Sequence, residues 1–406
     1  MALFILITGI FGLIYGAFYA VIALVGLIKK KPSIPFHAPE KHIAVLIPAR
    51  NEEAVVPFLI DSLQKQTYPK SLYEIIVIPN NCTDNTERAA KNAGARVMKV
   101  GDGMRSKGEV LRRAFLKLEK EAFDGYVVLD ADNVVNENFL QAANNTLCAG
   151  YEVGQARRES KNPYASWVAC CTSIFFWFMN SLFNRSRAAL GMSASLNGTG
   201  VLFSRKIIAQ TGYAVETLTE DLEYTAICAL NDCKIAYMED AVTYDEQPVS
   251  LRDSFTQRRR WSAGSFQCFK KFAGQLFKKR TLQAFDNLML FSAIVTQVVA
   301  LVPIVYAIFR FIRNIVVHNN WAATFYALFS AIAGMFLTGL TFAIIVAFAS
   351  GNFSRKLFPQ SLLMGFYLFT WMPANLLCLV TKPPKWTQIP HTFESSIADA
   401  ASENEG

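Results

Sequence analysis

The 406-residue chain has few of the residues on which many metal and nucleophilic sites depend. It contains only four histidines, at positions 37, 42, 318 and 391, so the middle of the chain has none. Its eight cysteines include no Cys-x-x-Cys pair, and Cys170 and Cys171 are adjacent. These counts argue against a histidine-based triad and against a Cys/His zinc site. We expect the cysteines to be reduced and buried, and carboxylates to carry any acid–base chemistry.

Charge is also scarce. Only 18% of the residues are charged and 52% are hydrophobic, whereas about 25% charged is usual for a soluble domain. This composition excludes a disordered chain and argues against an ordinary soluble enzyme. The net charge of +8 suits nucleic acid, an anionic membrane surface or an anionic substrate, and does not choose among them.

The hydrophobic residues are concentrated at the two ends of the chain. Residues 1–28 are uncharged and mostly apolar, and three lysines follow at 29–31. Three further apolar runs cover about 288–309, 322–350 and 357–381. Runs of this length predict membrane-spanning helices, and the lysines indicate that the next segment is cytoplasmic. We therefore expect a multi-pass protein of the plasma membrane, with a cytoplasmic domain at 29–285, about three spans within 286–381 and a tail at 382–406.

One apolar run lies inside the expected cytoplasmic domain. Residues 164–183 carry no charge and by hydropathy alone could form another span. A single span here would separate the two halves of the domain, so we expect a helix in the membrane interface or against the domain, anchored by aromatic residues such as Trp167 and Trp177. The remaining alternative is a helix in the core of a soluble domain.

Within 29–285, apolar segments alternate with amphipathic ones. Short buried strands are predicted at 43–48, 74–78, 95–100 and 126–129, with helices at about 54–65, 85–93 and 107–122. This alternation predicts an α/β fold with a mostly parallel, Rossmann-like sheet. Ligands of such sheets bind beyond the carboxyl ends of the strands, and polar clusters follow residues 48, 78 and 129.

Four short motifs could carry chemistry. Asp130-Ala131-Asp132 places two carboxylates at a strand end, which suits Mg²⁺ or Mn²⁺ with a diphosphate, although a solvated acidic turn is the alternative. Thr219-Glu220-Asp221 begins a helix and could be only a cap. Residues 257–261 (QRRRW) could be a basic patch beside the membrane. Residues 197–200 (NGTG) allow close backbone approach or form a plain turn.

In this order and spacing, D-A-D, T-E-D and Q-x-x-R-W resemble the inverting family-2 glycosyltransferases, specifically the membrane-embedded branch with the cellulose, hyaluronan and poly-N-acetylglucosamine synthases. The resemblance covers roughly residues 42–265. It implies a GT-A type nucleotide-diphospho-sugar transferase fold, flanked by transmembrane helices, with a UDP-sugar donor and a divalent metal.

The resemblance also implies roles for individual residues. Asp132 corresponds to the metal ligand, and Asp130 to a second residue that contacts the metal or the sugar donor. Asp221 corresponds to the catalytic base, and Glu220 precedes it in the same motif. The remaining donor and nucleotide contacts would be Pro48, Ala49, Arg50, Glu52, Asn80 and Lys107. The diphosphate and acceptor contacts would be Gln257, Arg260, Trp261, Gly198, Thr199 and Gly200. Asn80 stands where the family usually carries Asp, so it offers uracil an amide in place of a charge.

The implied activity is sugar transfer from a UDP-sugar to a glycan acceptor, and we expect processive polysaccharide synthesis. The alternative is non-processive transfer to a lipid or lipid-linked acceptor at the inner leaflet, which the small number of apolar runs keeps open. A transporter or a membrane scaffold is the non-enzymatic alternative, but neither explains D-A-D or T-E-D. Because the basic residues adjoin apolar runs, we expect membrane lipids, and not nucleic acid, as partners.

Overall fold

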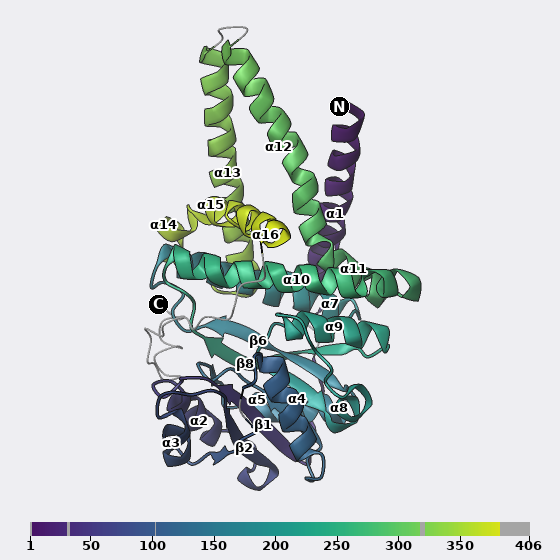
Figure 1. The fold of residues 1–406 in the computed structure, drawn as a ribbon, viewed down its shortest axis with the longest axis vertical. Helices are drawn as coiled ribbons and strands as arrows, with labels where there is room; N and C mark the ends of the chain where they lie inside the picture. Colours follow the sequence, from purple (N-terminus) through teal and green to yellow (C-terminus); the bar gives the residue numbers. More distant parts are fainter. Residues whose placement is uncertain (1, 31–32, 102, 317–320, 382–406) are drawn as a thin grey trace.

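A computed structural model describes residues 2–30, 33–101, 103–316 and 321–381. Lys31, His318, His391 and the tail at 382–406 lie outside the described residues. The chain forms an α/β domain, a layer of long helices lying across one side of it, and three helices that project away from that layer (Figure 1). All eight cysteines are free, and five of them are buried.

The domain is built on one mixed sheet of eight strands, in the order β3-β2-β1-β4-β7-β6-β8-β5. Strands β1 to β4 pair in parallel, and β6 also runs parallel to β8. By contrast, β7 is antiparallel to both β4 and β6, and β5 is antiparallel to β8. The strand bounds are β1 Ile43–Ala49, β2 Tyr73–Pro79, β3 Arg96–Val97, β4 Gly125–Val128, β5 Val134–Val135, β6 Val153–Ser160, β7 Val201–Ser204 and β8 Ile235–Asp245.

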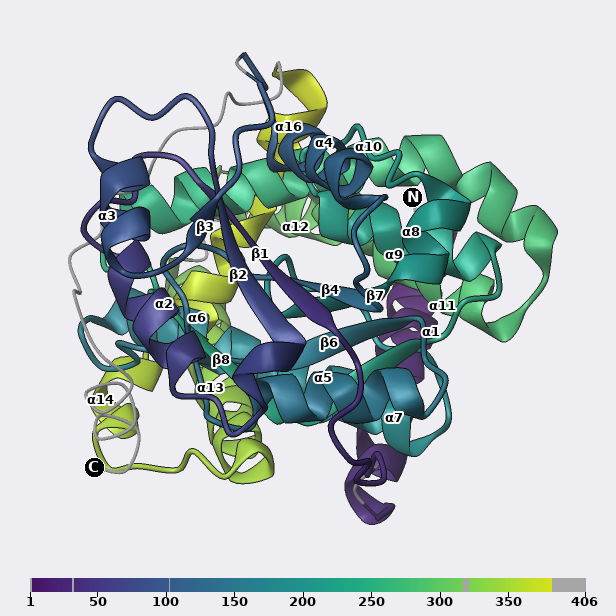
Figure 2. The same cartoon turned by 90° about the horizontal axis from the view of Figure 1, so that it is seen from below.

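Helices cover both faces of this sheet (Figure 2). In β1, Ile43, Val45 and Ile47 face α2 (Val56–Gln64) and α5 (Phe139–Cys148), whereas Ala44 and Leu46 face α4 (Lys107–Leu118). The second face also receives α8 (Arg205–Thr211) and α9 (Glu220–Leu230). A strand buried on both faces reads as a continuous apolar run, which is why residues 43–47 contain no alternation. The short helices η1 (Lys70–Leu72) and α3 (Thr86–Asn92) complete this half.

The predicted strands and helices of residues 43–129 are confirmed, with small changes at their ends. The strand predicted at 95–100 is only two residues long, and the helix predicted at 107–122 ends at Leu118. The sheet is less uniformly parallel than expected because β7 inserts antiparallel beside β4. The pattern of the first four strands contains no sign of this insertion, since β7 and β8 come more than 70 residues later in the chain.

The apolar run at 164–183 forms α6 (Trp167–Phe178), which continues as the π-helix η2 (Met179–Arg185) and α7 (Ser186–Ala189). Ser166 caps the start of α6 by accepting the amide N–H of Ala169. Val168, Ile174 and Trp177 are buried together with Ala343 and Val346 of α13 (Trp321–Ser350). The run therefore lies between the α/β domain and the base of α13.

The layer across the domain consists of α10 (Leu251–Lys279) and α11 (Leu282–Phe291) (Figure 1). Apolar side chains of α9, α10 and α11 form one cluster that includes Ala226, Phe272 and Phe291. Asp286 of α11 makes a buried ion pair of 2.8 Å with Arg187 of α7. Because α11 packs on the α/β domain, it spans the domain boundary expected at residue 285.

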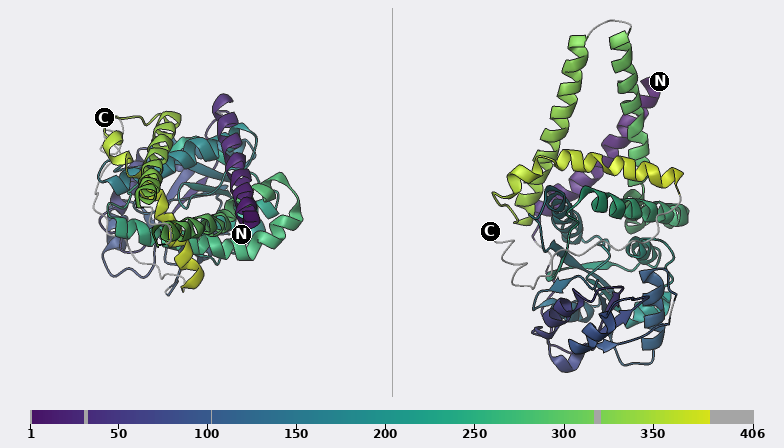
Figure 3. Two further views of the ribbon diagram at one scale, coloured as in Figure 1. Left: turned by 90° about the horizontal axis from the view of Figure 1, so that it is seen from above. Right: turned by 60° about the vertical axis from the view of Figure 1, so that its left-hand side comes forward.

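Three apolar segments of the described chain are long enough to cross a membrane: Leu6–Ile28, Trp321–Ser350 and Leu357–Val380. The first lies in α1 (Ala2–Ile28) and the second is α13, and both project from the domain beside α12 (Ala293–Val316) (Figures 1 and 3). The third is divided into α14 (Leu357–Ser361), α15 (Met364–Phe369) and α16 (Trp371–Val380). In both views α16 lies alongside α10, across the direction of α12 and α13.

Candidate active site

Lys107, at the first position of α4, joins three of the polar segments found in the sequence. Its Nζ donates to Asp130 Oδ1 at 2.5 Å and to the carbonyl oxygen of Gly198 at 2.7 Å, and lies 3.6 Å from Glu220 Oε1. Burial acts to lower the pKa of Lys107, but the carboxylates of Asp130 and Glu220 raise it above its usual value. The amine is therefore a permanent cation at the centre of the site.

The D-A-D motif lies directly beyond the carboxyl end of β4, as the sequence predicts. The amide N–H of Asp130 donates to Thr199 Oγ1 at 3.0 Å, and that hydroxyl in turn donates to Asn133 Oδ1. Asp132 Oδ1 accepts a hydrogen bond of 3.2 Å from the Asn133 amide. These bonds fix the loop after β4 against the Asn197–Gly200 turn.

The T-E-D motif begins α9 on the opposite wall. Burial, and then the negative charge of Glu220, raise the pKa of Asp221 to about 7. The Asp221 Oδ1 atom accepts a hydrogen bond of 2.8 Å from the backbone amide of Leu222, and a Cβ at Gly198 would lie 3.4 Å from Oδ2. The absence of a side chain at Gly198 thus leaves one face of this carboxylate open, as a general base requires.

The two glycines of the Asn197–Gly200 turn have different tasks. Both have positive φ, at 86° for Gly198 and 65° for Gly200. A Cβ at Gly200 would lie 2.8 Å from the Cβ of Ala156, so Gly200 permits close packing on β6. The Gly198 carbonyl binds Lys107 and its Cα faces Asp221. This turn is consequently part of the site itself.

Sequence reasoning missed a buried network behind this turn. Arg158 of β6 donates through Nε to Asp245 Oδ2 at 2.9 Å and through Nη1 to the carbonyl of Asn197 at 2.8 Å. Its guanidinium also stacks 4.0 Å from the ring centre of Phe176. Gln155 of the same strand bonds both the amide of Asn197 and the carbonyl of Thr199. The charged residues of β6 (VGQARRES) were the one available signal, but Arg158 and Asp245 are 87 positions apart and no local pattern pairs them.

The segment Pro48–Glu52 and Asn80 meet at the ends of β1 and β2. The amide of Asn80 donates to the carbonyl of Ala49 at 2.9 Å, and the amide of Glu52 donates to Thr86 Oγ1 at 2.8 Å. Asn80 is 8% exposed, its Nδ2 donates to the carbonyl of Met104, and its buried Oδ1 has no hydrogen-bond partner among the residues that the structure describes. That oxygen can accept an N–H donor from a ligand such as a nucleobase.

The Q-x-x-R-W residues lie on α10, and within the described part of the chain Trp261 makes its ring contacts with Phe176 and Trp371 and not with Asp221. The Trp261 ring stacks on Trp371 of α16 with centroids 6.0 Å apart, and meets Phe176 edge-on. Gln257 has a buried Oε1 that finds no partner within the described part of the chain. Helix α10 contacts the T-E-D motif through its own backbone, because Gly264 of α10 lies against the side chain of Thr219. The structure thus brings Lys107, Asp130, Gly198, Thr199, Glu220 and Asp221 together, and leaves Gln257, Arg260 and Trp261 on an adjoining wall.

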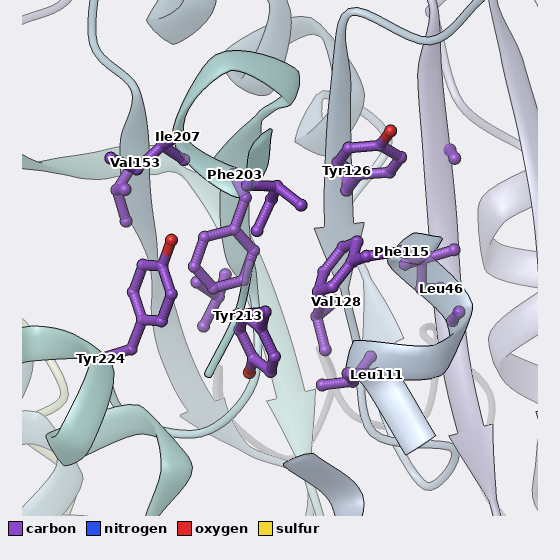
Figure 4. Close-up of a cluster of buried hydrophobic side chains, with 14 of the residues drawn as sticks. Leu46, Leu111, Phe115, Tyr126, Val128, Val153, Phe203, Ile207, Tyr213 and Tyr224 are labelled. Atoms are coloured by element: carbon purple, nitrogen blue, oxygen red, sulfur yellow. The ribbon is translucent and has the colours of Figure 1, made fainter. Parts of the chain in front are cut away.

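An aromatic cluster supports the floor of the site. Phe115, Phe203, Tyr213 and Tyr224 make edge-on or stacked contacts between α4, β7 and α9 (Figure 4). A small pocket lies between this cluster and the polar groups, lined by Lys107, Gly198, Glu220 and Asp221 on one side and by Tyr213 and Tyr224 on the other. Rigid aromatic packing therefore holds the starts of α4 and α9 in place.

The carboxylates after β4 suit a divalent cation whose coordination shell is completed by a bound ligand. Among the described residues, no group of three or more His, Cys, Asp or Glu side chains could enclose a metal. Asp130 and Asp132 nevertheless provide carboxylates at one strand end, and both are close enough to bear on the pKa of Arg158. Mg²⁺ is commonly held in this way, by one or two carboxylates together with substrate phosphates and water.

Comparison with known proteins agrees with this site. The chain superposes on a mannosyltransferase from Pyrobaculum calidifontis, solved with GDP-mannose and Mn²⁺, with a TM-score of 0.56 and 17% identity over 92% of this chain and 98% of the other. That likeness defines the architecture as GT-A-like. Residues 39–264 match the model of the family described as "Glycosyltransferase like family 2". The chain belongs to this family and is a glycosyltransferase.

Two curated relatives are more similar in sequence. A probable glycosyltransferase of Bacillus subtilis, YdaM, is 27% identical over 60% of this chain and 60% of its own length. The beta-monoglucosyldiacylglycerol synthase of a Nostoc species is 25% identical over 67% of this chain and 58% of its own length. The chain thus spans about three fifths of the length of these relatives. The prediction of a family-2 glycosyltransferase is confirmed.

Proposed function

We propose that this glycosyltransferase moves a sugar from a UDP-sugar to an acceptor carried by a membrane lipid, at the surface of the membrane and with inversion at the anomeric carbon. The observation that carries the proposal is the position of the site. Lys107 joins Asp130 to Glu220 at the start of α9, α9 packs on α10 through Thr219 and Gly264, and α1 and α13 project from the other side of α10 (Figure 1).

In this proposal Asp221 removes the proton from the acceptor hydroxyl, whose oxygen then attacks the anomeric carbon directly. A base with a pKa of about 7 is well matched to this task near neutral pH. Lys107 holds the diphosphate side of the donor, because its ammonium faces the loop after β4. The unpartnered Oδ1 of Asn80 accepts an N–H of the base. One base and one displacement give an inverted product.

We assign the divalent cation, Mg²⁺ or Mn²⁺, to Asp132 and Asp130. Bound there, it would neutralise negative charge on the leaving diphosphate. The chain's own contribution is to hold these carboxylates in place through Thr199 and Asn133. Arg158, which is fixed by Asp245, orients the Asn197–Gly200 turn that carries one wall of the site.

A lipid acceptor is favoured by how little the candidate spans pack on one another. Only 11% of the most apolar window in Leu6–Ile28 and 22% of that in Trp321–Ser350 is buried. Helices that enclose a polymer path would bury much more of their surface against each other. The similarity to the beta-monoglucosyldiacylglycerol synthase of Nostoc is also consistent with this acceptor class.

Processive polysaccharide synthesis is the second candidate, and the Q-x-x-R-W residues are what favour it. Trp261 offers an aromatic face beside the site, which is suited to stacking on a sugar. Incubation of the purified chain with radiolabelled UDP-sugars and Mn²⁺ or Mg²⁺ separates the two candidates. Label in a single solvent-extractable glycolipid supports lipid transfer, and label in a water-soluble polymer of increasing length supports processive synthesis.

We further propose that the α/β domain lies in the cytoplasm and that the protein is a multi-pass protein of the plasma membrane. Lys29 and Lys30 follow the first apolar segment, and Lys278, Lys279 and Arg280 lie at the end of α10. Basic residues at these positions favour the cytoplasmic side and attract anionic lipids. Cysteine accessibility on the two sides of intact cells or spheroplasts tests this orientation.

A further inference from the structure

Four aromatic rings form a closed cluster where α6, α10 and α16 meet. The Phe176 ring of α6 lies 5.4 Å from that of Phe175 and 6.1 Å from that of Trp261 on α10, measured between centroids. Trp371 of α16 completes the circle, at 6.0 Å from Trp261 and 5.5 Å from Phe175. Aromatic pairs at such separations attract one another beyond the burial of their area, so the four rings hold each other in place. We call these four side chains the aromatic quartet.

The quartet reaches the active site through Arg158. The guanidinium carbon of Arg158 lies 4.0 Å from the centroid of the Phe176 ring, which is a cation–π contact. The Nη1 atom of the same guanidinium donates to the carbonyl of Asn197 at 2.8 Å, and the carbonyl of the next residue, Gly198, accepts a hydrogen bond from Lys107. The Phe176 ring is therefore one contact away from the group that holds the Asn197–Gly200 turn.

Burial makes the ring a necessary support for the guanidinium. Phe176 is 3% exposed and the side chain of Arg158 is 11% exposed, so water cannot simply replace either partner. Asp245 holds one edge of the planar fork through Nε, and the Phe176 ring covers its face. Without the ring, the guanidinium is free to tilt about the bond to Asp245. The position of Phe176 therefore controls how well Nη1 meets the Asn197 carbonyl.

The far end of the quartet belongs to a candidate membrane segment. Trp371 is the first residue of α16 and lies within the apolar segment Leu357–Val380. Its indole contacts both Trp261 and Phe175, and each of these rings contacts Phe176. A displacement of α16 would consequently loosen Phe176 from two directions.

A second tryptophan of α6 shows what a purely structural contact looks like in the same region. Trp167 also joins α6 to the C-terminal segment, through a tilted contact of 6.2 Å with Phe366 of α15. Among the residues that the structure describes, its ring contact is with Phe366 and not with a member of the quartet. Trp167 therefore ties the same two segments together without a route to Arg158.

We propose that Trp371 is a positioning residue for the active site, which acts through the aromatic quartet on Arg158 and thereby on the Asn197–Gly200 turn. The proposal rests on the role in orienting this turn that the proposed function assigns to Arg158. It gives α16 a task besides association with the membrane, because the turn takes its working position when this segment rests on α10. The proposal is the same for a lipid acceptor and for a glycan acceptor.

The test is hydrogen–deuterium exchange, followed by mass spectrometry, on the full chain in a neutral detergent without donor or acceptor. The peptide 195–200 reports on the turn, since the amides of Ser195, Leu196 and Asn197 all donate to side chains. The peptide 43–49 of β1 reports on the rest of the domain. Trp371→Leu should make exchange in 195–200 about fivefold faster and leave 43–49 unchanged, as the loss of two ring contacts would.

Two further variants serve as controls. Trp371→Phe keeps an aromatic ring in the quartet and should restore exchange in 195–200 to within about twofold of the parent chain. Trp167→Leu removes an indole that lies outside the quartet and should leave both peptides unchanged. Faster exchange in 195–200 for Trp167→Leu, to the same extent as for Trp371→Leu, would contradict a specific route through the quartet.

A double-variant cycle separates positioning from general destabilisation. Arg158→Lys should itself speed exchange in 195–200, and the addition of Trp371→Leu should cause no further increase, because the rings act through the guanidinium. Phe175→Leu, which also opens the quartet, decides by the same comparison if Trp371→Leu does not fold. An unchanged 195–200 peptide in the deciding variant, or an equal increase in both backgrounds, would overturn the proposal alone. Parental exchange in Arg158→Lys would instead contradict the role given to Arg158 in the proposed function, and the proposal with it.

Discussion

Gly264 of α10 lies directly against Thr219, the first residue of the T-E-D motif. A Cβ on Gly264 would be 2.4 Å from Thr219 Oγ1 and 2.5 Å from its Cγ2, and Thr219 is only 5% exposed. A Cβ does not approach non-bonded atoms this closely, so one of the two residues would have to move. The helix that carries Q-x-x-R-W and the helix that carries the candidate base are therefore in register only because residue 264 has no side chain.

The first prediction follows from this contact. Gly264→Ala should push the start of α9 out of position and lower kcat by about 10²-fold, since small displacements of catalytic groups have effects of that size. Gly274→Ala on the same helix is the control, because its Cβ would meet nothing within 4 Å. It should keep full activity and unfold at a slightly higher temperature, because Ala favours the helix by about 1 kcal/mol. Equal activity in the two variants would contradict the claim that the Gly264–Thr219 contact positions the start of α9.

The second prediction concerns pH. Because Asp221 must be ionised to act as a base, transfer should increase with pH and level off above its pKa of about 7. Glu220→Gln removes the charge that helps to raise this pKa, so the midpoint of the rise should move to lower pH. The measurement is kcat/KM as a function of pH with saturating metal. An unchanged midpoint in Glu220→Gln would show that a different group controls the rise.

The third prediction tests the network that the sequence did not reveal. Arg158→Lys keeps the positive charge but loses the planar fork that binds Asp245 and the Asn197 carbonyl together. We expect kcat/KM to fall by about 10–100-fold, as for the loss of one or two charge-assisted hydrogen bonds. Lys206→Gln, which breaks an exposed pair with Glu152, should leave activity unchanged. Wild-type kinetics in Arg158→Lys would remove Arg158 from the positioning role.

The fourth prediction concerns the cation. Treatment with a chelator should abolish transfer, and Mn²⁺ or Mg²⁺ should restore it. Asp132→Asn should raise the metal concentration needed for half-maximal activity, because it removes one carboxylate from the proposed ligand set. Binding of UDP, measured by calorimetry with and without metal, provides a readout that does not require turnover. The same metal dependence in Asp132→Asn and in the parent chain would exclude Asp132 as a ligand.

Much of the site could be predicted from sequence because its key residues follow strand ends directly. Asp130 comes after β4 and Asn80 after β2, and parallel strands bring such residues to one edge of the sheet. Lys107 and Asp221 begin helices that return to the same edge. Local pattern was sufficient to place Asp130 and Asn80 at this edge, whereas Lys107 and Asp221 were singled out by the family resemblance and their roles stay predictions.

The rest depends on contacts between distant parts of the chain. Arg158 meets Asp245 only because β6 and β8 pair in parallel with a register shift after Ala156. The placement of α16 beside α10 likewise involves contacts between distant residues, such as the hydrogen bond between Arg258 and Thr370, 112 positions apart. Hydropathy gives the length of an apolar run but not the orientation of the helix that it forms. The sequence therefore could not show that α16 lies across the direction of α12 and α13.

The most direct test of the central claim is the fate of the labelled sugar. Membranes containing the full chain are incubated with a panel of radiolabelled UDP-sugars and Mn²⁺, extracted with organic solvent and compared with membranes containing Asp221→Asn. We predict that one donor labels a single extractable glycolipid, that the anomeric configuration is inverted, and that Asp221→Asn forms no product while it still binds UDP. Label found only in a water-soluble polymer, or equal labelling by Asp221→Asn, would contradict the account.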